Sequence, residues 1–295
     1  MQILDGKIVS QSVKDDLKSK VDLLKQQGKR LPFLAAVIVG NNGASETYVA
    51  SKTKNCDDIG FLSTTLRFEE TIPEDELIRV VEELNSDNKI DGILVQLPLP
   101  QHINNESIIN TINPSKDVDG FHPMSTGKLI QGSPTFIPAT PYGVMLMLAH
   151  YNIETNGKHA VVIGRSNIVG RPMSILLSQQ IPNGNCTVTL CHSHTKNLKE
   201  ICFQADIIIA ALGKPGFLTA DMVKENAVII DVGISRVADE SKKSGFTIKG
   251  DVDFENVASK SSYITPVPGG VGLMTIAALL KNTFNAYEMR EANSK

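Results

Sequence analysis

The run LPFLAAVIVG (31–40) is continuously apolar and ends in glycine, which is typical of a strand that is buried on both faces of a sheet. A helical pattern that contains Tyr48 follows it. Two further predicted strands, STTLRFE (63–69) and DGILVQLPLP (91–100), flank a helix that has Pro73 in its first turn. Strands that alternate with helices imply right-handed crossovers and a parallel sheet. The first half of the chain therefore predicts an α/β domain.

A second alternating series begins near His150. Its predicted strands are HAVVIG (159–164), CTVTLCH (186–192), ADIIIAALG (205–213) and AVIIDVG (227–233), with helices that start at Val169 and near Leu198. No strand follows the last apolar helical stretch, 273–289, so we expect it to pack back on the first domain. We predict an α/β fold with two α/β domains, 1–146 and 147–272, and a final helix, 273–295, that returns to the first.

Composition limits the location and the partners of the chain. It has 295 residues and a formal net charge of -3, with a pI near 6.1, which gives no general attraction to nucleic acid or to an anionic membrane. Its four cysteines form no CxxC pair, which suits a reducing compartment. No apolar run reaches the ~20 residues that span a bilayer, and the N-terminus lacks the apolar core of a signal peptide. We expect a cytoplasmic protein with no nucleic-acid, membrane or metal partner.

A glycine-containing turn joins a strand to a helix in HAVVIGRSNIVGRPM (159–173). Gly164 ends the predicted strand and Gly170 lies where the helix begins, so backbone N–H groups and the helix dipole could hold a pyrophosphate. The spacing is GxSxxxG rather than GxGxxG, because Ser166 replaces the middle glycine and Gly170 falls one residue late. The pattern predicts a dinucleotide site, and a simple tight turn is the alternative.

The end of the next predicted strand indicates which dinucleotide binds. An NAD site usually has an acid there for the ribose 2′-hydroxyl, whereas this strand ends CHSHT (191–195). Arg165, Ser193 and His194 are instead placed to receive a 2′-phosphate, which favours NADP over NAD. The alternative is that His192 and His194 are surface residues of a turn. Other glycine turns follow predicted strands and are candidate cofactor walls: ALGKPG (211–216), DVGI (231–234) and VPGGVG (267–272).

Polar residues in the first half converge on one predicted crevice. In a helix, Ser45, Tyr48 and Lys52 share one face, although an amphipathic rim with a solvated lysine is the simpler interpretation. Gln96 lies in an apolar strand, so its amide needs a partner, either a nearby loop or the crevice that Lys52 reaches. Asp119 either belongs to a plain Asp-Gly turn or presents its carboxylate to a ring with adjacent N–H groups, such as a pterin or a guanine-like ligand.

Seven segments that occur along nearly the whole chain resemble one enzyme family. They are SETYVASKTKNCDDIGF (45–61), DGILVQLPLP (91–100), KDVDGFHP (116–123), GRSNIVGRPM (164–173), GKPGF (213–217), DVGI (231–234) and YITPVPGGVGLMT (263–275). Together, in this order, they resemble the bifunctional methylenetetrahydrofolate dehydrogenase/methenyltetrahydrofolate cyclohydrolase (FolD) family. The resemblance implies an N-terminal catalytic domain that binds folate, a Rossmann-type NADP-binding domain and an active-site cleft between them.

The resemblance also implies roles for individual residues. Lys52 matches the catalytic lysine, Gln96 the glutamine paired with it, Tyr48 the tyrosine that stacks on the aminobenzoyl ring, and Asp119 the aspartate that holds the pterin. The implied substrate-binding residues are Ser45, Tyr48, Gln96, Leu97, Pro98, Asp119, Pro268 and Gly269. The implied cofactor-binding residues are Gly164, Arg165, Ser166, Ile168, Val169, Gly170, Ser193, His194, Gly213, Ile234 and Thr275.

The function implied by the resemblance is a two-step reaction on small-molecule tetrahydrofolate derivatives. NADP-dependent oxidation of 5,10-methylenetetrahydrofolate gives 5,10-methenyltetrahydrofolate, and hydrolysis then gives 10-formyltetrahydrofolate. The resemblance further suggests a homodimer. Alternatives are that one of the two activities is retained, that the chain is another two-domain NAD(P)-dependent dehydrogenase, or that it is a catalytically silent folate or NADP binder. Dehydrogenase turnover distinguishes the silent binder from the enzymes.

Overall fold

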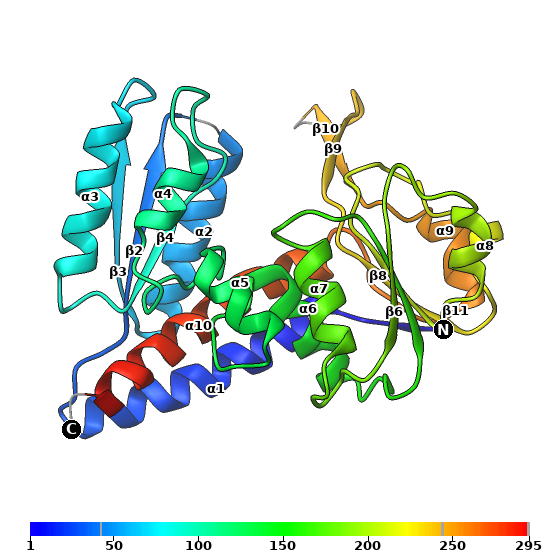
Figure 1. Cartoon of the computed structure of the whole chain (residues 1–295), viewed down its shortest axis with the longest axis horizontal. Helices are drawn as coiled ribbons and strands as arrows, with labels where there is room; N and C mark the ends of the chain where they lie inside the picture. Colours follow the sequence, from blue (N-terminus) through cyan, green and yellow to red (C-terminus); the bar gives the residue numbers. More distant parts are fainter. Residues whose placement is uncertain (42, 243–244, 294–295) are drawn as a thin grey trace. The chain divides into compact units, whose positions relative to one another are not determined.

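The chain folds into two compact units, each built around a parallel sheet (Figure 1). The computed structural model describes residues 1–41, 43–242 and 245–293, without the side chains of Ala44, Ser45, Thr47 and Asn293. Unit 1 comprises Met1–Ser10 and Thr140–Thr275, and unit 2 comprises Gln11–Ala139 and Ile276–Lys295. None of the described helices is long and apolar enough to cross a lipid bilayer.

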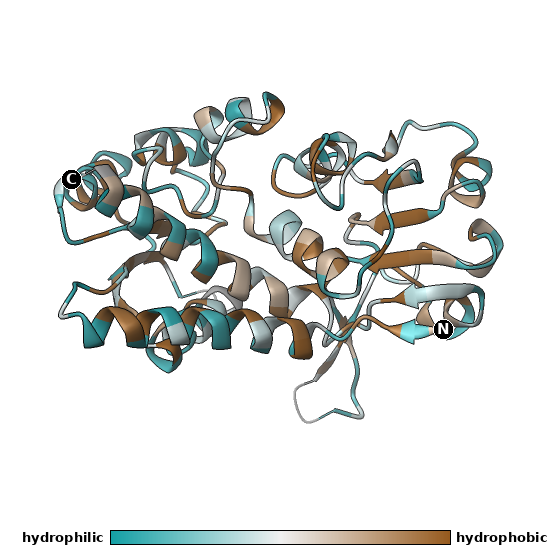
Figure 2. Ribbon diagram, turned by 90° about the horizontal axis from the view of Figure 1, so that it is seen from below, coloured by the Kyte–Doolittle hydropathy of each residue, from teal (hydrophilic) through white to brown (hydrophobic). Residues whose placement is uncertain are grey.

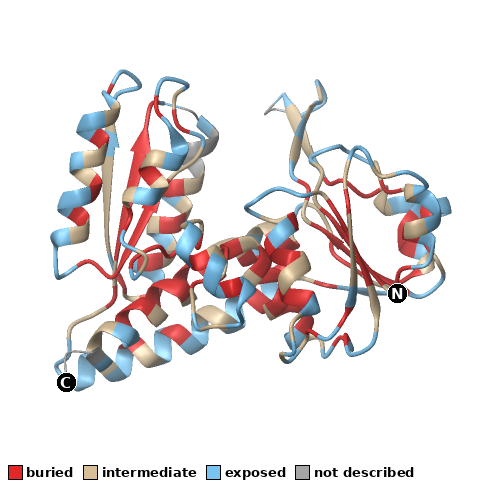
Figure 3. Ribbon diagram, viewed as in Figure 1, coloured by how far each residue is buried: buried red, intermediate tan, exposed pale blue. Residues whose placement is uncertain are grey.

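Unit 2 contains three described strands in the order β3-β2-β4, all parallel. The central strand β2 pairs Val37 with Leu66 of β3 on one side and with Val95 of β4 on the other. This position buries β2 on both faces, as its apolar sequence predicts (Figure 3). The elements are β2 (Phe33–Val39), α2 (Gly43–Ile59), β3 (Leu62–Phe68), α3 (Glu74–Ser86), β4 (Gly92–Val95), α4 (Asn105–Thr111), α5 (Pro123–Ile130) and most of α1 (Gly6–Gln26) and α10 (Val271–Asn293).

Helix α3 illustrates how local sequence orients an element on this sheet. Pro73 lies at its N-cap, and three acids fill its first turn, where the helix dipole favours negative charge. Leu77, Val81 and Leu84 are buried and recur at helical spacing, so they share one face. That face packs in the same core as the strand residues Val37 and Val95.

Unit 1 contains a six-stranded parallel sheet in the order β1-β11-β8-β7-β5-β6. Ile163 at the end of β5 pairs with Cys191 of β6 and with Ala210 of β7. The chain passes from β5 to β6 on one side and then to β7 on the other, so the strand order reverses at β5. Parallel sheets bind ligands outside the carboxyl ends of the strands at such a point. The strands are β1 (Gln2–Ile3), β5 (His159–Ile163), β6 (Thr187–Cys191), β7 (Ile207–Ala210), β8 (Ala227–Asp231) and β11 (Ser261–Ile264).

The strands β5, β7 and β8 of this sheet are strongly apolar, and β7 and β8 are buried along their whole length. Figure 2 shows the hydrophobic strands of the sheet in brown. The helical elements around them are α6 (Ala139–His150), α7 (Gly170–Ser178), α8 (Leu198–Phe203), η1 (Ala220–Met222), α9 (Phe254–Val257) and η2 (Ala258–Lys260). An antiparallel hairpin of β9 (Ser235–Ala238) and β10 (Phe246–Lys249) forms a separate two-stranded sheet. The predicted strands are all present, whereas β1, β11 and the hairpin do not follow from the apolar patterns.

The two units divide the chain at residues other than the proposed 146/147 and 272/273. The first ten residues belong to unit 1, because β1 extends its sheet beside β11. Helix α6 joins unit 1 as well, since a Cβ atom at Gly143 would lie only 2.7 Å from the Cβ of Met274. From Ile276 on, α10 lies in unit 2, where Asn282 Nδ2 donates to the carbonyl oxygens of Val118 and Ile137 at 2.8 and 2.9 Å.

Candidate functional site

Lys52 is a buried lysine in unit 2, with 5% of its surface exposed. It lies on α2 one turn after Tyr48, and its Nζ atom is 5.2 Å from the centroid of the Tyr48 ring. Nζ donates a hydrogen bond to Oε1 of Gln96 at 3.1 Å. Burial lowers the pKa of the Lys52 ammonium, and the negative charge of Asp119 opposes this effect. The Tyr48 ring and the Gln96 amide therefore lie next to the Lys52 amine, and the Asp119 carboxylate is near enough to affect its pKa.

Gln96 lies just beyond the end of β4, and it is half-buried. The predicted strand was longer, but β4 ends at Val95. The backbone N–H of Gln96 donates to the carbonyl oxygen of Val37 at 2.9 Å, which ties it to β2. Its side-chain Nε2 donates to the carbonyl oxygen of Leu97 at 2.7 Å. The amide is therefore held in place, and its oxygen faces Lys52.

The two acids of the KDVDGFHP segment have different surroundings. Asp117 is buried, and its carboxylate accepts hydrogen bonds from the N–H groups of Phe121 and His122 at 3.2 and 2.9 Å and from Ser125 Oγ at 2.8 Å. It closes the turn that leads into α5. Asp119 is half-buried, and no hydrogen-bond donor from the described residues reaches its carboxylate. Burial raises the pKa of Asp119. Its oxygens are available to a ligand.

A second buried lysine of this unit, Lys116, has a hydrogen-bond acceptor for each donor of its ammonium group. Nζ of Lys116 donates to the carbonyl oxygens of Leu84, Asn85 and Asp87 at 3.0, 2.7 and 2.8 Å. These bonds use all three donors of the ammonium and fix the chain after α3. Lys52, in contrast, has one hydrogen-bond acceptor among the described residues. Lys116 is therefore a structural residue, whereas Lys52 has donors left for a ligand or water.

The remaining predicted folate-binding residues lie in both units. Leu97 is half-buried and Pro98 is exposed in unit 2, directly after Gln96. Ser45 belongs to α2, but its side chain lies outside the described residues. Pro268 and Gly269 lie in unit 1 in the loop before α10, where the Gly269 carbonyl accepts a hydrogen bond from the N–H of Gly6 at 2.9 Å, so that this loop is fixed to the start of α1.

A pocket of about 450 Å³ lies at the carboxyl ends of β5, β6 and β7 in unit 1. Arg165 and Lys214 supply positive charge, and none of the residues that line the pocket is an acid. This composition fits a phosphate group. The lining residues are Ile163, Gly164, Arg165, Ser166, His192, Ser193, Thr195, Leu198, Ala211, Leu212, Lys214 and Phe217.

The GxSxxxG turn connects the end of β5 to the first residue of α7, Gly170. Gly164 has a φ of +121°, and a Cβ atom there would collide with the carbonyl oxygen of Ala211. A Cβ at Gly170 would collide with the carbonyl oxygen of Gly164, so both positions require glycine. Ser166 Oγ accepts hydrogen bonds from the N–H groups of Val169 and Gly170 at 3.2 and 3.4 Å. The serine that departs from the usual fingerprint therefore holds the backbone of the turn that leads into α7.

The turn after β6 carries the predicted 2′-phosphate residues. Arg165, Ser193 and His194 are exposed, and Arg165 and Ser193 line the pocket. His192 has a structural part in this turn, since its Nδ1 atom accepts from the N–H of His194 at 3.2 Å and its own N–H donates to Thr195 Oγ1 at 2.8 Å. Burial lowers the pKa of His192, and the neighbouring Arg165 and His194 lower it further. Arg165 therefore places a positive charge near this turn.

Other predicted cofactor residues lie on neighbouring turns and helices of unit 1. Ile168 and Ile234 are 47% and 54% exposed, Gly213 follows β7 with a φ of +70°, and Thr275 Oγ1 lies 3.0 Å from Thr140 Oγ1. The pocket is also lined by residues that the sequence does not single out individually: Ile163, Thr195, Leu198, Ala211, Leu212, Lys214 and Phe217. All of these except Leu198 lie within segments quoted above for their strand ends or glycine turns, so those segments were the available signal.

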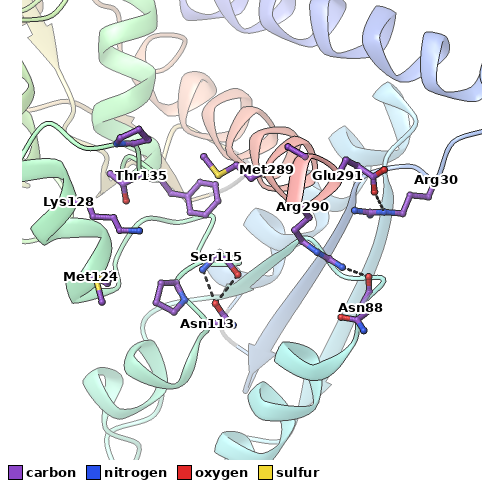
Figure 4. A pocket seen from close by; sticks show the side chains of 14 residues that line it. Arg30, Asn88, Asn113, Ser115, Met124, Lys128, Thr135, Met289, Arg290 and Glu291 are labelled. Carbon is purple, nitrogen blue, oxygen red and sulfur yellow. Dashed lines mark hydrogen bonds and ion pairs between the residues drawn. The ribbon is translucent and has the colours of Figure 1, made fainter. Parts of the chain in front are cut away.

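A second hollow, of about 1230 Å³, lies in unit 2 (Figure 4). It is lined by residues near the amino ends of β2 and β4, such as Arg30 and Asn88, and by the end of α10. Its two arginines are paired, because Arg30 contacts Glu291 at 2.7 Å and both Arg30 and Arg290 contact the buried Asp91. Ligands of parallel sheets bind at the opposite, carboxyl edge. We therefore place the candidate site at Lys52 and at the pocket of unit 1.

Comparison with known proteins identifies the family of the chain. Residues 4–119 match the tetrahydrofolate dehydrogenase/cyclohydrolase catalytic domain, and residues 138–291 match the NAD(P)-binding domain of the same family. A bifunctional protein FolD from Flavobacterium johnsoniae is 58% identical over the full length of both chains.

Two solved structures are similar over nearly the whole chain. The bifunctional methylenetetrahydrofolate dehydrogenase/cyclohydrolase FolD from Campylobacter jejuni is 49% identical, with a TM-score of 0.92 over 98% of this chain and 99% of that one. The Trypanosoma brucei methylenetetrahydrofolate dehydrogenase-cyclohydrolase, solved with NADP and an inhibitor, is 36% identical, with a TM-score of 0.92 over 98% of this chain and 97% of that one. These matches confirm the predicted two-domain α/β fold. The chain belongs to the tetrahydrofolate dehydrogenase/cyclohydrolase family.

Proposed function

We propose that the chain catalyses two consecutive reactions, the NADP-dependent oxidation of 5,10-methylenetetrahydrofolate to 5,10-methenyltetrahydrofolate and the hydrolysis of that product to 10-formyltetrahydrofolate. Membership of the family supports both activities. The structural observation that carries the proposal is Lys52, a buried amine that has one amide partner and an open carboxylate, Asp119, beside it.

In the oxidation, unit 2 holds and orients the folate. The Tyr48 ring stacks on the aminobenzoyl ring, and the Asp119 carboxylate accepts paired hydrogen bonds from the N–H groups of the pterin. The methylene bridge of the folate loses a hydride, and bound NADP supplies the nicotinamide carbon that accepts it. The contribution of the protein is chiefly alignment, which is worth about 7–11 kcal/mol when the reacting atoms are well oriented.

In the hydrolysis, Lys52 moves protons at its Nζ atom. Water adds to the methenyl carbon of the cationic substrate, and the bond from that carbon to N5 of the folate breaks. One proton of the water passes to N5, and the other is released to solvent as the formyl group forms. A lysine with an ordinary pKa of about 10.4 would be protonated at neutral pH and would be a poor base. Because burial lowers the pKa of Lys52, the amine can accept a proton from the water and return it to the leaving nitrogen. Gln96 holds the amine through its side-chain oxygen.

In unit 1, the 164–170 turn and the start of α7 receive the pyrophosphate, and Arg165, Ser193 and His194 receive the 2′-phosphate. Lys214 lines the same pocket and adds a second positive charge. The NAD(P)-binding domain match and the NADP complex of the Trypanosoma relative support this cofactor. The further folate-binding residues that we propose are Ser45, Leu97, Pro98, Pro268 and Gly269. The further cofactor-binding residues are Ile168, Val169, Gly213, Ile234 and Thr275.

We further propose that the protein is a cytoplasmic homodimer. The cysteines Cys56, Cys186, Cys191 and Cys202 are all free and buried, which is compatible with a reducing compartment. Light scattering coupled to gel filtration measures the mass, and a monomer mass at working concentration would contradict the dimer.

The proposed function is tested by following reduced nicotinamide and methenyltetrahydrofolate separately by absorbance. With 5,10-methylenetetrahydrofolate, we expect reduction of NADP without accumulation of the methenyl product. Reduction with NAD alone would refute the 2′-phosphate assignment, and no reduction with either nucleotide would refute the dehydrogenase. Lys52→Met should abolish hydrolysis of added methenyltetrahydrofolate, whereas Lys54→Met, an exposed lysine on the same helix, should not. Normal hydrolysis by Lys52→Met would refute the role of Lys52.

A further inference from the structure

Two carboxylates are buried in unit 1 without a counter-ion within salt-bridge distance among the described residues. Asp231, at the end of β8, is 3% exposed, and Asp251, after β10, is 0% exposed. Backbone N–H groups surround both. A buried carboxylate is costly unless hydrogen bonds compensate it, so the contacts of these two acids indicate what they hold in place.

Asp251 binds the turn that follows β7. Its Oδ2 atom accepts hydrogen bonds from the N–H groups of Leu212 and Gly213 at 2.5 and 2.9 Å, and its Oδ1 atom accepts one from the N–H of Lys214 at 2.7 Å. Three consecutive N–H groups therefore point at one carboxylate. Leu212 and Lys214 also line the pocket beside Arg165. The shape of this pocket wall depends on Asp251.

Asp231 in turn binds the segment that carries Asp251. Its Oδ1 atom accepts from the N–H groups of Gly233 and Asp251, both at 2.9 Å, and its Oδ2 atom accepts from the N–H of Val252 at 2.9 Å. Gly233 immediately precedes Ile234, another proposed cofactor residue. Burial raises the pKa of Asp231 to about 6, against the effect of these three N–H groups. The two acids thus form a relay from β8 to the turn after β7.

Two glycines make room for this relay. A Cβ atom at Gly233 would collide with the carboxylate of Asp251, and one at Gly250 would collide with the carboxylate of Asp231. The glycine of the DVGI segment is therefore explained by its packing against Asp251. Neither carboxylate lines the pocket, so the pair acts on a ligand only through the backbone that it fixes.

We propose that Asp231 and Asp251 are positioning residues for the nucleotide, because the pair holds the 212–214 turn, and through Gly233 the start of the next loop, in the conformation that binds NADP. This inference rests on the proposed function of unit 1 and deepens it. Preorganised N–H groups save the cost of ordering the turn when the nucleotide binds. Without the carboxylates, the turn would adopt other conformations, and the affinity for NADP would fall by the fraction of time spent in them.

Asp251→Asn tests the relay with little change in shape. The amide keeps one acceptor oxygen, which can face Leu212 and Gly213, but its NH₂ group then opposes the N–H of Lys214. We expect the Kd and the KM for NADP to rise about tenfold or more, since a hydrogen bond to a charged group is lost and a donor is left unpaired. The kcat at saturating NADP should change little, and hydrolysis of methenyltetrahydrofolate without nucleotide should stay normal. Glu255→Gln, an exposed acid nearby, is the matched control.

The outcomes separate this inference from the proposed function. If calorimetry shows that the wild-type protein does not bind NADP, the proposed function and the inference are both refuted. If Asp251→Asn binds NADP as tightly as the wild type, the inference alone is refuted. A parallel loss of NADP binding and methenyl hydrolysis would also refute it, because that is what a general loss of stability produces.

Hydrogen exchange of the wild-type protein provides a second test that needs no variant. If Asp251 holds the turn in advance, the N–H groups of Leu212, Gly213 and Lys214 should be protected from exchange without nucleotide, and NADP should add little protection. Rapid exchange of these three N–H groups without NADP, followed by protection when NADP binds, would show that the nucleotide orders the turn, and would refute the inference.

Discussion

Replacing Gln96 by glutamate puts a carboxylate where an amide oxygen now lies 3.1 Å from the Nζ atom of Lys52. In the present arrangement burial lowers the pKa of Lys52, and the hydrolysis that we propose requires the neutral amine. A carboxylate at this distance stabilises the ammonium instead. We therefore expect Gln96→Glu to raise the pKa of Lys52 and to move the pH dependence of hydrolysis to higher pH.

The size of the shift follows from the geometry. Two unit charges about 3 Å apart attract by about 5 kcal/mol at an effective dielectric constant of about 20, which is an upper bound. Part of this is offset, because the new carboxylate loses water and cannot donate to the Leu97 carbonyl as Gln96 does. Opposite charges at close range shift pKa values by about 1–3 units. The rate at neutral pH should fall about 10- to 1000-fold, since each pKa unit is a factor of ten.

The assay is the loss of methenyltetrahydrofolate absorbance, without nucleotide, over a range of pH. Asp119→Asn provides the opposite perturbation, because the negative charge of Asp119 raises the pKa of Lys52 and its removal should move the profile to lower pH. Gln101→Glu introduces the same charge at an exposed position of the loop after β4 and should leave the profile unchanged. A folded Gln96→Glu variant that is slower at every pH with an unmoved profile would refute the reasoning.

Two further predictions concern the nucleotide pocket and the turn before α5. Arg165→Leu should raise the KM for NADP about tenfold or more, because a charge-assisted hydrogen bond is lost, and should leave the KM for NAD unchanged. Steady-state kinetics measures both constants, and a parallel rise in the two KM values would contradict the 2′-phosphate assignment. Burial raises the pKa of Asp117 from its ordinary 3.8 to about 6, so its stabilising contribution is full below the ordinary pKa and is lost as the pH rises through about 6. Because Asp117→Asn lacks this titration, the difference in the free energy of unfolding between wild type and variant should fall by about 3 kcal/mol between about pH 4 and pH 7 in urea titrations, and a difference that is constant with pH would contradict it.

The strands β2, β4, β5, β7 and β8 could be predicted because each is a largely continuous apolar run, as burial on both faces requires. The strands β1 and β11 could not, because Gln2–Ile3 and Ser261–Ile264 are short and partly polar and become strands by pairing with neighbours in space. The boundaries of the two units also depend on contacts between residues that are far apart in the sequence, so local patterns do not predict them. An example is α6, whose placement depends on the close approach of Gly143 to Met274.

The candidate site was predictable where an isolated polar residue required an explanation. Gln96 after an apolar strand and Lys52 on a helix face are examples, and the structure brings them within hydrogen-bond distance. The sequence could not separate Asp117 from Asp119, since both are acids of one loop and their surroundings depend on which way the turn closes. Asp251 carried no local signal, because its partners lie far away in the sequence, at Leu212 and Lys214.

The charged residues of this chain differ in how completely the protein satisfies their hydrogen bonds, and this difference separates residues with a structural role from candidates for catalysis. Asp91 is fully buried, but the guanidinium groups of Arg30 and Arg290 and the N–H of Phe33 satisfy its carboxylate. It therefore ties the start of β2 and the end of α10 together. Lys52 is also buried and Asp119 is half-buried, yet neither has a full set of partners among the described residues. An incompletely paired buried charge costs several kcal/mol, so a fold retains one only where something else completes it. A folate that brings N–H donors to Asp119 and an acceptor to Lys52 would complete both, and we therefore propose that chemistry occurs at these two residues rather than in the larger hollow near Arg30.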